Sequence, residues 1–368
     1  MNELAKIIIE YIYRVLLCQV IFGYPIVSKS YRFMTKRFQE LLSWLQTHLE
    51  LPFAQLVPIT NDASFRRYFR VSVEGTSYIV MDAPPDKENC RSFIDIAERL
   101  RRSGLNAPQV IAHNLETGFL LLTDLGSQLY LSALTKETVE QLYIDALNAL
   151  VIMQTQTAYE GLPLYNHRLL HQEMNLFSDW LLGQHLNLVL SPTERTELIT
   201  CCELLSTAAL SQPQVFVHRD YHSRNLMVVS HQNPGILDFQ DAVKGPITYD
   251  LVSLLRDCYI TWSPERINHW VRQYFSQAQA TGLLSKLTES QLFHWFDWMG
   301  IQRHLKASGI FARLYHRDGK AGYLKDIPRT LNYIVEVSAN YPELTFLHEL
   351  VSKRVLPVYQ SSLPYNTA

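Results

Sequence analysis

The hydrophobic positions follow two different periods in the first part of the chain. Residues 34–51, MTKRFQELLSWLQTHLEL, predict a helix with a single apolar stripe, formed by Phe38, Leu41, Leu42, Leu45 and Leu49. The runs RRYFRVSV and SYIVMDA are instead rich in aromatic and β-branched residues. The tripeptide EGT at 74–76 separates these two runs, which predicts a β-hairpin. A helix over residues 89–103 and two strands within PQVIAHNLETGFLLLTDLG are expected to complete a small sheet with one inserted helix.

From residue 135 onward the period is mostly helical. One segment interrupts it, QVFVHRDYHSRNLMVVSHQNPGILDFQDA at 214–242, in which short β-branched runs flank polar loops. The helical pattern resumes at Asp250 and continues towards the C-terminus. We therefore predict an α+β fold with two lobes, a small β-rich N-lobe over 34–126 and a larger, mainly helical C-lobe over 127–368. The hinge is expected near LLTDLGS.

Residues 1–33 are expected to be an N-terminal extension that belongs to neither lobe. Their apolar runs are broken by Glu10, Arg14, Gln19, Gly23 and Pro25, whereas a spanning helix needs about 20 predominantly apolar residues. The segment also lacks the basic start and the cleavage site of a secretory signal. An interfacial or packing helix, and a natural start of translation at Met34, both remain open. Stable membrane insertion is not expected.

Charge and cysteine content narrow the class of protein. The net charge of −2 argues against a nucleic-acid-binding protein, which usually carries a basic face. The five cysteines form no C-x-x-C pair, and an odd count is poor material for a disulfide framework. They predict reduced, buried thiols in a cytoplasmic protein. No feature of the sequence indicates an obligate protein partner.

The segment VHRDYHSRN, followed by a short apolar run and GILDF, carries the candidate chemistry. Phosphoryl transfer from ATP needs Mg²⁺ to neutralise phosphate charge and a carboxylate to orient the attacking hydroxyl. Asp220 is the candidate base, and the oxygens of Asn225 and Asp238 are hard ligands that suit Mg²⁺. The spacing matches the protein-kinase signature H-R-D-x-x-x-x-N. The alternative is that Asp220 and Asn225 only cap a turn.

Several features point away from a protein kinase. His222 replaces the lysine that is usual two residues after the base, and Gln240 follows the Asp-Phe pair where glycine would stand. No Ala-Pro-Glu motif occurs downstream, and a helix follows almost at once in AVKGPITYDLVSLLRD, which leaves no room for a regulatory activation loop. The phosphate acceptor is therefore expected to be a small molecule.

These segments resemble a known family. HRDYHSRN together with LDFQDAVKGPITYDLVSLLRD resembles the aminoglycoside phosphotransferase/choline kinase superfamily. NDASFRRYFR, IVMDAPPDKENCRSF and GIFARLYHRDGKAGYLKDIPRTL are more similar to the bacterial anomeric kinases of N-acetylmuramate and N-acetylglucosamine, which act in peptidoglycan recycling. The resemblance runs from about Met34 to the C-terminus and leaves residues 1–33 outside.

The resemblance implies a protein-kinase-like bilobal fold, with ATP and Mg²⁺ as cofactors and the sugar 1-phosphate as product. It implies that Asp220 is the catalytic base and that Asn225 and Asp238 hold Mg²⁺. His218 and Asp250 would give structural support, with Asp250 as a buried carboxylate that braces the catalytic loop. Asp241 would bind a second metal ion or the substrate.

Two parts of the kinase pattern are missing from the N-lobe. NDASFRRYFR contains no glycine where a glycine-rich phosphate loop is expected, so the backbone near Ser64 and the guanidinium of Arg66 or Arg67 are the candidate phosphate contacts. Met81 stands where the lysine that pairs with ATP phosphates should be, and methionine supplies no cation. The segment from Leu122 to Asp124 is the candidate adenine hinge. Solvated arginines in the hairpin and a plain buried strand are the alternatives.

The acceptor is expected against the C-lobe. Candidate substrate-binding residues are Glu173, His222, Asp241, Arg303 and Arg313, with Asn175, His304, Lys306, Arg317, Asp318 and Lys320 as further polar positions. A sugar with a lactyl carboxylate favours an arginine or histidine partner. Two other functions remain open: a kinase of another small molecule, such as an aminoglycoside, choline or homoserine, and a nucleotide-binding pseudokinase. The sequence does not rank the two amino sugars.

Overall fold

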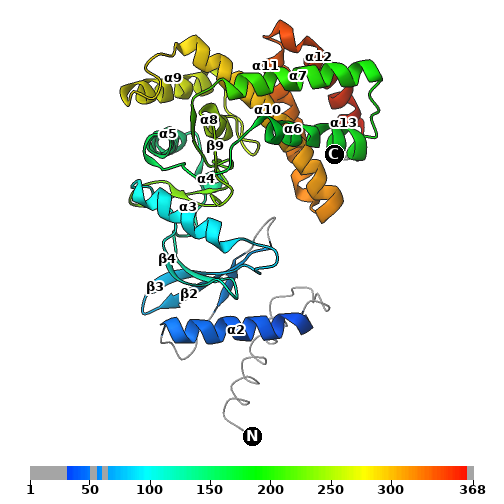
Figure 1. The fold of residues 1–368 in the computed structure, drawn as a ribbon. Coiled ribbons are helices and arrows are strands. Elements are labelled where there is room, and N and C mark those ends of the chain that lie inside the picture. The colour runs from blue at the N-terminus through cyan, green and yellow to red at the C-terminus, as the bar shows by residue number, and fades with distance from the viewer. Residues whose placement is uncertain (1–30, 50–55, 60–64, 363–368) are drawn as a thin grey trace.

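The computed structural model describes residues 31–49, 56–59 and 65–362. Its N-terminal part is a five-stranded antiparallel sheet in the order β1-β2-β3-β5-β4, flanked by two helices (Figure 1). The elements are α2 (Tyr31–Leu49), β1 (Val57–Ile59), β2 (Arg67–Val73), β3 (Thr76–Asp82), α3 (Cys90–Arg102), β4 (Val110–Asn114) and β5 (Phe119–Thr123). The predicted small sheet with one inserted helix is confirmed, although the first helix begins at Tyr31, three residues earlier than expected.

The predicted hairpin is confirmed between β2 and β3, with Val73 paired to Thr76. Its two loop residues, Glu74 and Gly75, both have positive φ values of 48° and 82°. This backbone twist matches the twist of the strands that the loop connects. Because side chains alternate along β3, Val80 joins the buried cluster formed with α2, whereas Met81 joins the large core cluster that includes α3.

The C-lobe is built mainly from helices around the 30-residue α10 (Glu289–Asp318), which contacts α6, α7, α8 and α11. Gly309 lies where α10 crosses the end of α6, and a Cβ there would stand 2.2 Å from the carbonyl carbon of Leu176. The other helical elements are α4 (Tyr130–Ala133), α5 (Val139–Gln156), α6 (His167–Leu176), η1 (Phe177–His185), α7 (Pro192–Leu210), α8 (Thr248–Leu255), α9 (Pro264–Ala280), η2 (Ala321–Asp326), α11 (Ile327–Ser338), η3 (Pro342–Leu344), α12 (Thr345–Leu350), η4 (Val351–Val355) and α13 (Leu356–Ser362).

Two short antiparallel strand pairs frame the segment that interrupts the helical pattern. β6 (Gln214–Val217) pairs with β9 (Val243–Pro246), and β7 (Leu226–Met227) pairs with β8 (Gly235–Ile236). The backbone N–H of Val228 donates to Gln128, and that of Ile236 donates to Asn106, at 2.8 Å each. These bonds tie the β7–β8 hairpin to the chain on either side of β4 and β5, so the loop after β6 lies where the two lobes meet (Figure 1).

No described helix combines the length and the apolar character that crossing a membrane requires. The described cysteines, Cys90, Cys201, Cys202 and Cys258, are free and buried.

Candidate active site

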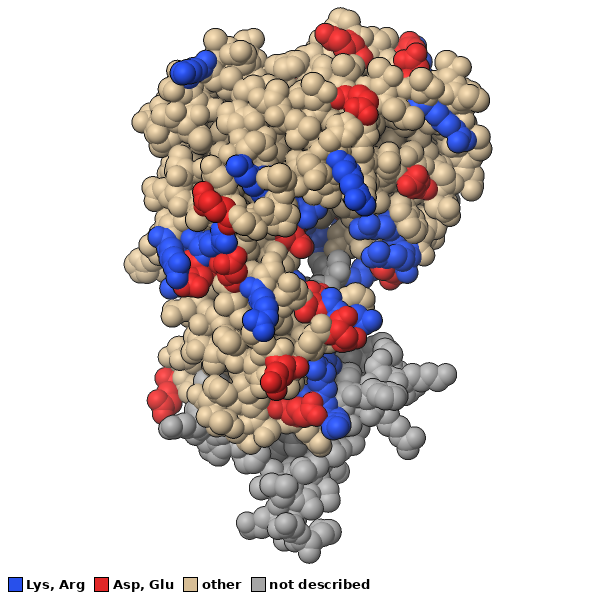
Figure 2. All heavy atoms as spheres, in the orientation of Figure 1, with Lys and Arg blue, Asp and Glu red and all other residues tan. Residues whose placement is uncertain are grey.

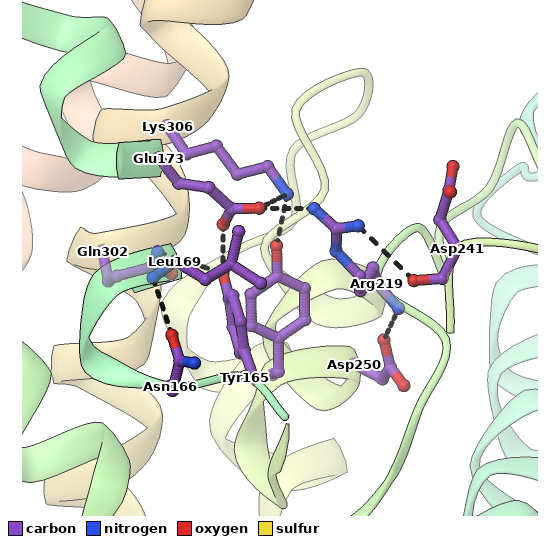
Figure 3. Close-up of polar contacts among 10 residues, drawn as sticks. Tyr165, Asn166, Leu169, Glu173, Arg219, Asp241, Asp250, Gln302 and Lys306 are labelled. Atoms are coloured by element: carbon purple, nitrogen blue, oxygen red, sulfur yellow. Dashed lines mark hydrogen bonds and ion pairs between the residues drawn. The ribbon is translucent and has the colours of Figure 1, made fainter. Parts of the chain in front are cut away.

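A buried carboxylate fixes the turn that follows β6. Asp250, on α8, accepts a hydrogen bond from the backbone N–H of His218 at 2.6 Å. It accepts a second one from the backbone N–H of Arg219 at 3.0 Å (Figure 3). Arg219 has a φ of +78°, a conformation that a non-glycine residue adopts only when its surroundings hold it there. Burial raises the pKa of Asp250 to about 7, despite the two N–H groups that favour its charged form. Asp250 thus occupies the position that a brace of this loop requires.

His218 connects the loop to the strand that leads to Asp238. Its Nδ1 lies 3.2 Å from the backbone N–H of Asp220 and accepts from it, so Nε2 carries the proton and donates to the carbonyl of Leu237 at 3.0 Å. Burial lowers the pKa of His218 to about 4, which keeps the ring neutral and preserves this pair of bonds. The neutral ring therefore fixes the spacing between Asp220 and Asp238.

Asp220, Asn225 and Asp238 converge, as the motif predicts. The Asn225 side-chain N–H donates to the backbone carbonyl of Asp220 at 3.0 Å and lies 3.4 Å from a carboxylate oxygen of Asp238. With its nitrogen directed to the loop, the Asn225 oxygen is left for a ligand. Partial burial, and then the negative charge of Asp220, raise the pKa of Asp238 above its ordinary value. The carboxylate of Asp238 and the amide oxygen of Asn225 are hard ligands, and a cation such as Mg²⁺ would relieve the repulsion between Asp238 and Asp220.

Asp220 remains ionised through its basic neighbours. Burial alone would raise the pKa of this carboxyl, but the charges of Lys306, His222 and Arg303 outweigh burial and lower the pKa to about 2. At neutral pH the group is therefore a carboxylate that accepts hydrogen bonds and is a weak base in the resting protein.

A pocket opens beside Asp220, and the space between its walls is about 410 Å³ when the part open to solvent is included. One face of α10 forms its floor, with Arg303, Lys306, Ala307, Ile310 and Phe311. The rest of the lining comes from His222 of the catalytic loop, Tyr249 of α8, and Cys258 and Tyr259, which follow α8. Carboxylate, guanidinium and aromatic groups therefore face the same space, which suits a polar molecule that also has apolar surface.

Arg224 stacks on Tyr259, one of the residues that line the pocket. The Arg224 guanidinium lies over the Tyr259 ring, 4.7 Å from its centroid, and 5.4 Å from the centroid of Tyr323. Tyr323 in turn stacks on Phe311 at 5.7 Å. Arg224 belongs to the catalytic loop, so this contact links the loop to the aromatic side of the pocket.

Glu173 lies at the centre of a buried ion cluster, beside the Arg219 guanidinium (Figure 3). It is 2.5 Å from the Arg219 guanidinium and 3.0 Å from the Lys306 Nζ, and it accepts a hydrogen bond from the Tyr165 hydroxyl. Burial raises the pKa of Glu173, but the two cations outweigh burial and lower it. Its side chain does not line the described pocket; instead it positions Arg219 and Lys306.

Replacing Glu173 with glutamine should destabilise the protein. Removing one partner of a buried ion cluster leaves the remaining charges uncompensated, which costs about 3–5 kcal/mol. We expect that loss in the free energy of unfolding measured by urea denaturation. Glu197→Gln, at an exposed position on α7, serves as the control. A loss no larger than that of the control would contradict the structural role of Glu173.

Arg66 and Arg67 point to different places. Arg67 pairs with the buried carboxylate of Asp82, which also binds Arg37. Arg66, with 8% of its side chain exposed, is 2.8 Å from Glu88 and 4.0 Å from Asp238. Only Arg66 of the two thus reaches the lobe junction, and it does so beside a metal-ligand candidate. Met81 is fully buried in the core.

The other predicted nucleotide contacts lie at the end of β5 or outside the described residues. Leu122 pairs with Ile79 on one side and Val110 on the other, within the sheet. The Asp124 carboxylate accepts from Arg70 at 2.6 Å and Ser77 at 2.6 Å, which braces the strand ends. Ser64 belongs to the residues that the structure does not describe.

Two predicted substrate contacts lie apart from the pocket lining. Asp241 has an exposed side chain, and its backbone carbonyl is 3.4 Å from the Arg219 guanidinium. Arg313 is on α10, but neither residue is among those that line the described pocket. The sequence reasoning did not single out Tyr249, Cys258, Tyr259 or Glu88. Glu88 carried a local signal, since it directly precedes the Asn89 cap of α3.

Charged side chains of both signs gather about the waist between the two lobes (Figure 2). The ion pairs described above, from Arg66 to Glu88 and from Arg219 to Glu173, belong to this junction. Here a polyanionic ligand would meet cations from both lobes.

Comparison with known proteins identifies the family of this chain. Residues 55–284 match the sequence profile described as "Phosphotransferase enzyme family". The chain is 43% identical over 326 residues to an N-acetylmuramate/N-acetylglucosamine kinase of Pseudomonas aeruginosa, with 86% of this chain and 96% of the relative covered. The relative of the same name from Pseudomonas putida is 44% identical, with the same shares covered. A choline kinase structure from Streptococcus pneumoniae has a TM-score of 0.59 at 11% identity, covering 81% of this chain and 99% of that chain. This likeness confirms the predicted kinase-like fold.

Proposed function

Because this chain belongs to the phosphotransferase enzyme family, we propose that it transfers the γ-phosphoryl group of ATP to the anomeric hydroxyl of N-acetylmuramate, N-acetylglucosamine or both. The product would be the sugar 1-phosphate, as in peptidoglycan recycling. One observation carries the proposal: Asp220 stands between the Asn225–Asp238 pair and a pocket lined by cationic and aromatic side chains.

Asp220 would hold the acceptor hydroxyl in line with the phosphoryl group. A base with a pKa of about 2 does not ionise a sugar hydroxyl in the ground state. It accepts the proton late, when the oxygen–phosphorus bond is forming and the hydroxyl has become acidic. Asn225 and Asp238 would hold Mg²⁺, which neutralises phosphate charge when bound.

Arg303 is the proposed partner for a lactyl carboxylate. Its guanidinium lines the pocket, and its Nε has no hydrogen-bond partner among the described residues. Lys306 also lines the pocket, but its Nζ already contacts Tyr249 at 2.8 Å and Glu173 at 3.0 Å. A buried guanidinium with an unused N–H favours a planar acceptor such as a carboxylate. The substrate-binding proposals of lower rank are His222, Asp241, Arg313 and Glu173. Glu173 would act through the cations that it positions.

On the nucleotide side, Arg66 would supply the charge that Met81 lacks. Kinases pair a strand lysine with a helix glutamate to hold the α- and β-phosphates. Here the Arg66–Glu88 pair stands between the sheet and the start of α3 and points at Asp238. The backbone around Leu122 to Asp124 is the proposed adenine hinge, and Ser64 remains a proposed phosphate contact. ATP supply and the free cysteines support a cytoplasmic location.

The test is turnover against a panel of acceptors. Purified protein is incubated with ATP and Mg²⁺ and with amino sugars, aminoglycosides, choline or homoserine, while ADP release is followed. We expect ADP release with an amino sugar, together with loss of its reducing end. Turnover with another acceptor would reassign the substrate. ATP binding without any turnover would identify a pseudokinase.

A further inference from the structure

A second convergence of ligand atoms lies between α6 and α7, apart from the residues that line the pocket. His167 and His171 are one turn apart on α6, with ring centroids 4.2 Å apart and planes inclined by 22°. Glu203, on α7, faces both rings. Its carboxylate oxygens lie 2.7 Å from the Nε2 of His167 and 3.5 Å from the Nε2 of His171.

These distances suit a tetrahedral metal ion. One ligand atom from each of the three residues can be chosen so that all lie within 4.8 Å of one another. A Zn²⁺ ion with bonds of about 2.0–2.2 Å separates its ligand atoms by roughly 3.3–3.6 Å. The 3.5 Å distance falls within this range, whereas the 2.7 Å distance is that of a hydrogen bond between His167 and Glu203, so the His167 ring has to move outward to admit the ion. His167 and Glu203 are about half exposed, at 51% and 50%, which leaves a path for the ion and room for a water ligand.

The Nε2 of His171 is poorly satisfied without a ligand. This atom is inaccessible to solvent and makes no hydrogen bond among the described residues. Its nearest acceptor is the Glu203 carboxylate at 3.5 Å, which is beyond the length of an ordinary hydrogen bond. A cation between this nitrogen and the carboxylate would contact both groups.

We propose that His167, His171 and Glu203 form a binding site for a divalent transition-metal ion such as Zn²⁺, with water as the fourth ligand. Two imidazoles and one carboxylate select such an ion over Mg²⁺, which prefers oxygen. The ion would clamp α6 to α7. Glu173 follows His171 by two residues on α6, so the clamp would steady the helix that positions Arg219 and Lys306.

The test titrates Zn²⁺ into metal-free protein by isothermal calorimetry. We expect saturable binding of one ion per chain at this site, and a melting temperature that rises by a few degrees with excess Zn²⁺. His171→Ala and Glu203→Gln should each weaken binding at least about 10-fold, because loss of a ligand costs at least as much as loss of the groups behind it. The control is His269→Ala, an exposed histidine on α9, which should bind as the parent does.

Unchanged Zn²⁺ affinity in both variants would place the ion elsewhere and overturn the proposal. If a variant fails to fold, the unaltered protein with Co²⁺ provides the answer. The visible spectrum should be that of tetrahedral Co²⁺ with nitrogen and oxygen ligands, and a purely octahedral spectrum would overturn the site.

Discussion

Replacing Asp220 with asparagine should lower kcat for sugar phosphorylation by about 10²–10⁴-fold, the usual contribution of a positioned base. Asparagine keeps the size of the side chain but cannot accept the proton of the attacking hydroxyl. The backbone carbonyl of Asp220, which holds the Asn225 side chain, is unaffected by the change. ATP affinity, measured by equilibrium binding in the presence of Mg²⁺, should therefore stay within a few-fold of the parent.

The pH dependence adds a second readout. Because the pKa of Asp220 is about 2, its ionisation should not appear as an acid limb in kcat/KM at any pH where the protein is assayed. Asp179→Asn, at an exposed position on η1, is the matched control and should leave kcat unchanged. A folded Asp220→Asn protein that retains parental kcat would refute the assigned role. A large loss of ATP affinity would instead indicate a metal-binding role.

The parts of the site that the sequence predicts are those that lie close together along the chain. Asp220 and Asn225 are fixed by one short loop, and Asp238 by the hairpin that follows it. The spacing of these residues along the chain therefore determines most of their geometry. The β2–β3 hairpin is predictable for the same reason, because alternation and a two-residue turn determine it locally.

The rest depends on contacts between distant segments. Glu173 meets Arg219 across 46 positions, and the pocket combines one face of α10 with loops that lie far from it along the chain. The choice between Arg66 and Arg67 depends on how the start of β2 is oriented in the sheet, and nothing in the sequence distinguishes two adjacent arginines. The sequence predicts Asp124 as a hinge residue because it follows a strand. In the structure its carboxylate accepts hydrogen bonds from Arg70 and Ser77.

Replacing Arg66 with methionine should lower kcat/KM for ATP by about 10²–10³-fold, the usual cost of removing one preorganised electrostatic contact to the developing charge. Methionine retains a linear side chain but leaves no cation on this side of the phosphates, since Met81 supplies none. Arg66→Lys should restore part of the activity because it restores the charge without the guanidinium fork. Steady-state kinetics with varied ATP at saturating acceptor would measure both variants.

Glu88 makes this prediction specific to the ion pair. Glu88→Gln removes the carboxylate that lies 2.8 Å from Arg66, so Arg66 loses its alignment but not its charge, and a smaller loss in kcat/KM for ATP is expected. In the Arg66→Met background, Glu88→Gln should lower kcat/KM for ATP little further, because the effects of residues that act as a unit are not additive.

Arg102→Met, at a position on α3 with 76% of its side chain exposed, controls for loss of an N-lobe arginine. If folded Arg66→Met protein keeps kcat/KM for ATP within a few-fold of Arg102→Met, the replacement cation must lie elsewhere. Additive losses in the double variant would mean that Glu88 does not act through Arg66.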